Sequence, residues 1–198
     1  MADPAPILCL ESSSPQGGSW ALCLHGHPLQ SGNFSGRASS ALPACLAPVL
    51  PFSRPPAEIR VGVGPGSFSG IRAALALAQG LALPWKATVQ PIRSTHSIGL
   101  QYPNVSFLGV FSDARRGQLF VTCYTRGRLA RPSQVIPRDH LPLWLAKCTL
   151  AVSTDGFDPT LPLATPHASH LAWPLDHYGE HQTLPAEPIH LRPPLATP

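Results

Sequence analysis

Charged side chains are scarce in this chain of 198 residues. Asp, Glu, Lys and Arg together make up 12% of the sequence, and the net charge is +4. The basic residues are spread along the chain, apart from Arg115-Arg116 and the group Arg126, Arg128 and Arg131. A nucleic-acid-binding stripe requires cations clustered along one face, so this pattern favours a solvated basic surface instead.

Long hydrophobic runs and paired cysteine motifs are also absent. No stretch approaches the roughly 20 apolar residues that span a membrane, and the N-terminal segment lacks the basic residues of a signal peptide. The five cysteines are widely spaced, without a C-x-x-C pair: Cys9, Cys23, Cys45, Cys123 and Cys148. We therefore predict a cytoplasmic protein with buried, reduced thiols and no membrane attachment.

The motifs of nucleophilic and metal-dependent catalysis are missing as well. The sequence contains no G-x-S-x-G elbow and no H-E-x-x-H. His167 and His170 have a spacing that could bring both rings to one metal ion, but a solvated helix end is the favoured interpretation. The sequence thus predicts no catalytic residue, no metal site and no cofactor held by this chain alone.

Proline, by contrast, is abundant. The chain has 25 prolines and 16 glycines, and 43% of its residues are hydrophobic. Proline and glycine together remain below the range typical of low-complexity disorder. These numbers favour a folded protein with many stiff loops and a core sufficient for one domain or two small lobes.

Strand patterns occur twice in the same order. The first series is predicted to form strands at residues 6–10, 19–24, 27–34, 59–63 and 88–92. That series leads into a short helix at 94–100. The second is predicted to form strands at 106–111, 117–124 and 149–152, with short helices at 138–146 and 167–178. We predict an α/β protein with two related lobes, residues 1–100 and residues 101–198.

Two longer helices are predicted within the first lobe. The first covers residues 38–50 and should kink or end early at Pro48; the second covers residues 69–83. The second helix is apolar nearly all round, so it must be covered on more than one side. Either its own domain covers it or one face meets a partner. For the second case, the candidate contact residues are Leu42, Leu46, Val49, Ile71, Ala74, Leu75 and Ala78.

A glycine-rich loop separates the strand at 59–63 from the second helix. Gly64 and Gly66 allow backbone angles closed to other residues, and Ser67 can cap the helix. The spacing is neither a Walker A loop nor a dinucleotide fingerprint. Two interpretations stay open: a tight turn that binds nothing, and an anion-binding loop. The candidate residues for the second are Gly64, Gly66, Ser67, Gly70, Arg72, Glu11 and Asp113.

Five segments, in order, resemble the bacterial TsaB (YeaZ) family. The glycine loop resembles the family signature G-P-G-S-F-T-G-[LIV]-R. The other similar segments are Ile7–Ser14, Ala78–Ala82, Ser112–Phe120 and Ala186–Arg192. The resemblance covers nearly the whole chain, and five segments in the right order are more specific than any single loop.

The resemblance implies an actin/Hsp70/sugar-kinase (ASKHA) fold with two ribonuclease-H-like lobes. It implies a non-catalytic scaffold that pairs with a TsaD-like catalytic subunit, together with a TsaE-like ATPase. That machinery transfers a threonylcarbamoyl group to the adenosine following the anticodon in tRNAs that read codons beginning with A. The chain would then meet tRNA indirectly, could form a homodimer when alone, and could share a nucleotide at the partner interface.

Several residues depart from the family pattern. Glu11 stands where many members have Asp, the usual helix-opening His is absent near Arg37, and His190 replaces a Tyr. Glu11 and Asp113 each end the first strand of a lobe, where a kinase of this fold would need a carboxylate. Acceptance of hydrogen bonds from nearby loop N–H groups or from Arg72 is the favoured role. An ATP-dependent kinase and a peptidase remain the alternative functions.

Overall fold

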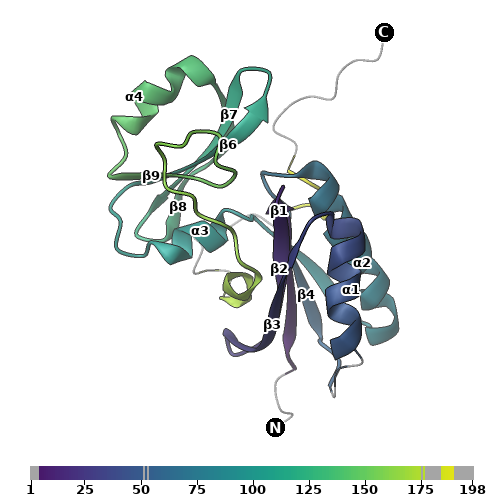
Figure 1. The fold of residues 1–198 in the computed structure, drawn as a ribbon. Coiled ribbons are helices and arrows are strands. Elements are labelled where there is room, and N and C mark those ends of the chain that lie inside the picture. Colours follow the sequence, from purple (N-terminus) through teal and green to yellow (C-terminus); the bar gives the residue numbers. More distant parts are fainter. Residues whose placement is uncertain (1–4, 51, 53, 175, 177–183, 190–198) are drawn as a thin grey trace.

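A computed structural model describes residues 5–50, 52, 54–174, 176 and 184–189. The chain forms two lobes, each built on its own β-sheet (Figure 1). The N-terminal sheet contains β1 (Ile7–Ser14), β2 (Gly17–Leu24), β3 (His27–Ser35), β4 (Glu58–Gly62) and β5 (Thr88–Ile92). The C-terminal sheet contains β6 (Leu108–Arg115), β7 (Gln118–Thr125), β8 (Arg128–Pro137) and β9 (Leu150–Ser153).

The two sheets share a strand order. The first is ordered β3-β2-β1-β4-β5 and the second β8-β7-β6-β9. In each, three consecutive strands pair antiparallel and the fourth strand returns parallel to the first. The predicted duplication of an α/β unit is therefore confirmed. Among the described residues, the C-terminal sheet has four strands and contains no equivalent of β5.

Two helices cover one face of the N-terminal sheet (Figure 1). These are α1 (Ala38–Leu46) and α2 (Phe68–Trp85), which also pack against each other. The predicted early end of the first helix is confirmed, because the chain continues as a short 3₁₀ turn, η1 (Ala47–Val49), with Pro48 inside it. Between helices and sheet lies the larger apolar core, which includes Leu8, Leu10, Val61, Leu42, Leu46 and Ile71.

The connection between the lobes is a short helix, α3 (His96–Gln101), with buried polar contacts. The Tyr124 hydroxyl lies 2.7 Å from Thr95 Oγ1 and 3.0 Å from His96 Nδ1. Arg93 donates to Ser133 Oγ at 2.8 Å, which ties the end of the first lobe to β8. Because all these side chains are buried, their hydrogen bonds hold the segment that connects the two lobes in place.

One strand was missed by the sequence prediction. β8 carries Arg128, Arg131 and Pro132, and most of its side chains are exposed. It is an edge strand with irregular register against β7, a position that tolerates proline and breaks the simple alternation of apolar and polar residues. The predicted helix at 138–146 is present as η2 (Arg138–His140) followed by α4 (Leu141–Leu145).

Part of the described chain after β9 packs against the first lobe. The predicted helix at 167–178 is instead a 3₁₀ turn, η3 (Ala168–Ala172), and residues 175 and 177–183 lie outside the described part. η3 packs on the face of the N-terminal sheet opposite α1 and α2. Buried Arg60 on β4 donates to Glu58 Oε1 at 2.7 Å and to the carbonyls of Leu171 and Trp173. The expectation that all residues after 100 form the second lobe is thus corrected.

No described helix is both long enough and apolar enough to cross a membrane. The five cysteines are free, and Cys9, Cys23 and Cys123 are buried. Burial raises the pKa of the Cys9 thiol well above its usual range. The interpretation of the cysteines as buried thiols is confirmed for these three, while Cys45 and Cys148 are only partly buried.

Candidate functional site

The glycine loop packs directly against the end of β1. Gly64 has a φ of +96°, a left-handed conformation that favours glycine. At Gly66 and Gly70 the constraint is steric: a Cβ at Gly66 would collide with the Ser13 carbonyl oxygen, and one at Gly70 with that of Ser12. Gly66 also has a φ of +158°, so the prediction that it adopts backbone angles rare for other residues is confirmed, and the close approach of two backbones adds a second constraint.

Hydrogen bonds within the protein occupy much of this loop. The Ser67 N–H donates to the Ser13 carbonyl at 2.7 Å, and the Gly64 N–H donates to Ser94 Oγ at 2.9 Å. Ser67 caps α2, because its hydroxyl accepts from the Gly70 N–H at 3.4 Å. An anion cradle needs such N–H groups to be available, so these bonds favour a turn that orients α2.

Glu11 is buried beneath the loop, with an exposed fraction of 1%. One carboxylate oxygen, Oε1, accepts from the Ser13 N–H at 2.7 Å. The other lies so close to Gly62 that a Cβ there would collide with it. Burial raises the pKa of the Glu11 carboxyl, although the hydrogen bonds from Ser13 and Ser94 oppose that shift. The side chain is therefore sealed inside the first lobe.

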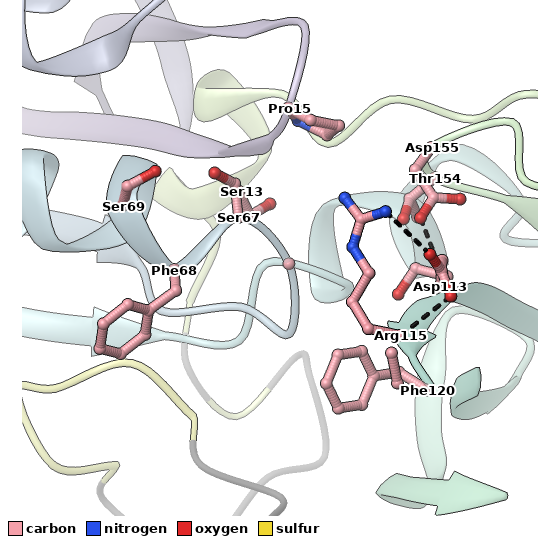
Figure 2. Close-up of a pocket in the computed structure, with 13 residues that line it drawn as sticks. Ser13, Pro15, Ser67, Phe68, Ser69, Asp113, Arg115, Phe120, Thr154 and Asp155 are labelled. Atoms are coloured by element: carbon pink, nitrogen blue, oxygen red, sulfur yellow. Dashed lines mark hydrogen bonds and ion pairs between the residues drawn. The ribbon is translucent and has the colours of Figure 1, made fainter. Parts of the chain in front are cut away.

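A cavity of about 540 Å³ lies between the lobes. Figure 2 shows its two walls: the start of α2 with Ser67, Phe68 and Ser69 on one side, and the ends of β6 and β9 on the other. The residues that line it are Ser13, Pro15, Gly66, Ser67, Phe68, Ser69, Ser112, Asp113, Ala114, Arg115, Phe120, Thr154 and Asp155.

The two carboxylates that line this cavity, Asp113 and Asp155, already accept hydrogen bonds from neighbouring residues. Asp155 Oδ2 accepts from the Asp113 N–H at 2.7 Å. Asp113 Oδ1 accepts from the Arg115 N–H at 2.9 Å, and Arg115 Nη1 lies 3.3 Å from Asp113 Oδ2 (Figure 2). The favoured role of Asp113 and Glu11 as acceptors of local N–H groups is confirmed. Sequence reasoning missed Asp155, because nothing in a single Asp-Gly pair predicts its contact with β6.

The described lining offers little for catalysis. It contains hydroxyls but no histidine, and Glu11 does not reach it, so the two strand-end carboxylates do not face each other. A serine nucleophile needs an adjacent base, and phosphoryl transfer needs a free carboxylate or bound metal. Among the described residues, no group of three His, Cys, Asp or Glu side chains could hold a metal ion.

Comparison with known proteins gives concordant results. A family model described as "TsaD: tRNA N6-adenosine threonylcarbamoyltransferase" matches residues 55–131. No curated protein matches the sequence. Among solved structures, YeaZ from Pseudomonas aeruginosa is 25% identical with a TM-score of 0.69, over 95% of this chain and 100% of that one. These findings support the predicted resemblance to the TsaB (YeaZ) family. A second Pseudomonas aeruginosa structure, described as similar to peptidase YEAZ, is 23% identical with a TM-score of 0.67, over 96% and 100% of the two chains, and supports the same fold.

The mixed α/β structure with two sheets matches YeaZ and an ASKHA fold of the TsaD type, and the two matches suggest a member of a tRNA modification system. The two sheets with shared strand order are what that fold requires. The predicted C-terminal segment Ala186–Arg192 is described only as far as Ile189, whose N–H donates to the Val63 carbonyl at 2.8 Å. His190 lies outside the described residues.

The contact residues predicted on α1 and α2 need correction. Six of the seven are core side chains with exposed fractions of 5% or less: Leu42, Leu46, Ile71, Ala74, Leu75 and Ala78. Val49 is partly buried and packs against the same core. The apolar face of each helix covers the sheet below it, as the alternative interpretation held. These side chains are therefore covered by the chain's own core, and the exposed positions of α1 and α2 lie on the outward face of the two helices.

Two further expectations also turn out differently. Arg72 is exposed and its guanidinium stacks over the Phe68 ring at 5.5 Å, without an ion pair to any described carboxylate. His167 and His170 are partly buried, with ring centroids 6.1 Å apart. They bond to Ser169 and Ser97 rather than ending a solvated helix, and burial lowers the pKa of both.

Proposed function

We propose that this chain is a non-catalytic scaffold subunit of a tRNA threonylcarbamoyltransferase complex. It pairs with a TsaD-like catalytic paralogue in the cytoplasm. That paralogue, with a TsaE-like ATPase, modifies the adenosine that follows the anticodon in tRNAs reading codons that begin with A. The likeness to YeaZ and the match to the TsaD model support a role of the TsaB type.

The observation that carries the proposal is the outward face of α1 and α2. The two helices and η1 contain a single charged residue, Arg72. Their exposed positions are otherwise small, apolar or uncharged: Ser39, Ser40, Pro43, Ala44, Ala47, Pro48, Phe68, Ser69, Ala76, Gln79, Gly80, Leu83 and Pro84. Leu83 is 80% exposed. A solvated helix face ordinarily carries many charges, whereas surfaces buried between proteins are depleted of them.

Small side chains on this face have a second consequence. Ala76, Gly80 and Ala44 allow another helix to approach closely, so a rigid partner with a matching helical surface fits best. A TsaD-like paralogue presents such a surface if it shares the fold of this chain. The buried TsaB core residues beneath, such as Ala74 and Leu75, keep the two helices in place without touching the partner.

The test is a charge placed on the outward face. Ala76→Arg leaves the core intact but buries an unpaired cation in the proposed contact, so affinity for the TsaD-like partner should fall by roughly two orders of magnitude or more. Ala130→Arg, at an exposed alanine on β8, is the matched control and should bind normally. Native mass spectrometry of each variant with the partner measures the heterodimer.

Two further arms complete this experiment. Native mass spectrometry of the chain alone should show whether the same face forms a homodimer. Ala76→Arg would weaken such a homodimer as well. The isolated chain should have no steady ATPase or peptidase turnover, because the described cavity lining has no histidine and its carboxylates, Asp113 and Asp155, already accept hydrogen bonds from the chain. An undiminished heterodimer from folded Ala76→Arg protein would contradict the proposed interface. Turnover abolished by Asp113→Asn would contradict the scaffold role.

A further inference from the structure

Two cations share one aromatic ring on the outer side of the C-terminal lobe. The guanidinium of Arg131, on β8, lies 5.9 Å from the centre of the Trp144 ring, and the ammonium of Lys147 lies 5.3 Å from it. Arg131 and Lys147 are exposed, while Trp144 is half-buried against the second core. Trp144, which belongs to α4, thus makes cation–π contacts with two positively charged side chains and holds them near its ring.

These two cations have no acidic partner among the described residues. From Gln118 to Leu150 the chain carries Arg126, Arg128, Arg131, Arg138 and Lys147 against a single carboxylate, Asp139. The two ion pairs found in the described part of the chain involve Arg60 and Arg115 instead. Like charges held together without a counter-charge repel each other, and binding of a polyanion relieves that repulsion.

Arg138 provides a contrast on the same lobe. It also stacks on an aromatic ring, that of Phe157 at 5.1 Å, and donates to the Phe157 carbonyl at 3.1 Å. Hydrogen bonds from Thr160 lower the pKa of the Asp158 carboxyl, and the nearby charge of Arg138 adds to that shift. Arg138 therefore has an acidic neighbour within the protein, whereas neither ion pair in the described part of the chain involves Arg131 or Lys147.

More cations extend the charge along the same hairpin. Arg126 and Arg128 lie at the turn between β7 and β8, and both are exposed. Arg128 pairs in register with Thr125, and Arg131 with Cys123, two residues earlier on β7. That spacing corresponds to about 7 Å along a strand. We call Arg126, Arg128, Arg131 and Lys147 the outer basic surface.

We propose that the outer basic surface binds the phosphate backbone of RNA. Three of its four cations are arginines, whose planar guanidinium groups pair with phosphate oxygens in two-point contacts. An anionic membrane fits less well, because α4 has only five residues and cannot form an interfacial helix. The identity of the RNA as tRNA rests on the proposed function, whereas the inference that this surface binds RNA does not.

Its position permits use together with the proposed partner contact. α4 and the β7–β8 hairpin belong to the C-terminal lobe, whereas α1 and α2 cover the outer face of the N-terminal lobe (Figure 1). A subunit docked through α1 and α2 would leave the outer basic surface open. The chain would then contribute directly to RNA binding by the complex, beyond holding its partner.

The experiment measures binding of the full chain to a fluorescently labelled tRNA transcript by anisotropy, between about 50 and 200 mM salt. The unaltered chain should bind with an affinity that falls steeply with salt. Arg131→Gln combined with Lys147→Gln should weaken binding about tenfold at the lowest salt and reduce the salt slope by about two. Arg138→Gln is the matched control and should bind normally, and Lys147→Arg should retain binding because it keeps the charge.

Three results would overturn the proposal. The unaltered chain could fail to bind tRNA in a salt-dependent way, or the double Gln variant could bind equally well with an unchanged melting temperature. The third result is preferential binding of the chain to phosphatidylglycerol vesicles or to an acidic peptide. Loss of the heterodimer in Ala76→Arg tests the partner contact separately. That variant should keep its tRNA affinity, so failure of one proposal can be distinguished from failure of the other.

Discussion

The close approach of Gly66 to β1 supports a prediction whose size can be worked out. A Cβ at this position would collide with the Ser13 carbonyl oxygen and lie 2.8 Å from Ser13 Cβ. The atoms in the way include backbone, so neither can rotate aside. Gly66→Ala must therefore move the loop or the end of β1, and the 2.7 Å bond from the Ser67 N–H to the Ser13 carbonyl is lost or stretched.

The cost combines two effects. Forcing an extra methyl group into a close-packed contact costs about 1 to 3 kcal/mol. Losing one buried backbone hydrogen bond adds about 1 kcal/mol. The sum for Gly66→Ala is roughly 2 to 4 kcal/mol of unfolding free energy, which for a chain of this length lowers the melting temperature by about 5 to 15 °C.

Two glycines with open surroundings provide the comparison. Gly80 lies in α2 with nothing within 4 Å of a Cβ, so Gly80→Ala should stabilise the protein by about 0.5 to 1 kcal/mol. Gly36 is equally open but has a φ of +83°, so Gly36→Ala should cost about 1 kcal/mol through backbone strain alone. Urea and thermal unfolding followed by circular dichroism measure all three. If Gly66→Ala melts with the unaltered protein, the steric argument is wrong, and a phosphate-binding role for the loop becomes the better explanation of its glycines.

The remaining predictions concern buried polar groups. Arg60→Met should cost roughly 2 to 4 kcal/mol, because it leaves the Leu171 and Trp173 carbonyls without their donor, and hydrogen exchange should speed up at η3 before it does so in the sheet. Burial raises the pKa of Glu11 above its ordinary value near 4.5, so its contribution to stability is complete below that pH and is lost as the pH rises through the raised pKa. Glu11→Gln should flatten this loss in urea titrations as the pH is raised above 4.5, and an unchanged pH profile would contradict the burial argument. Burial lowers the pKa of His170 below 6.5, so the protein loses stability as the pH falls from 6.5 through the lowered pKa. His170→Gln should reduce that loss of stability. If the variant loses as much stability as the unaltered protein, other groups are its cause.

Local sequence signals were sufficient for most elements. Strands such as residues 6–10 and 106–111 combine apolar runs with flanking turn residues, and each signal lies within ten residues of the element it predicts. The repeat of strand order at 6 and 106 predicted two related lobes for the same reason. The prediction failed where local signals are weak. β8 is an exposed edge strand with a proline, and η3 has its packing partners in the first lobe.

The candidate site depended on tertiary contacts to a greater degree. The sequence by itself determined that a glycine loop precedes a helix with a single charged residue, and that two strands end in carboxylates. Only the fold decided that Glu11 is sealed beneath Gly62 while Asp113 faces the cavity beside Asp155, because those contacts join strands that are distant in sequence. The fold likewise decided that Leu42 and Ala74 point inward, since an apolar helix carries no signal for which side meets the sheet. Arg131 and Lys147 are 16 positions apart in the chain, and packing of α4 on the second sheet is what brings both to one ring.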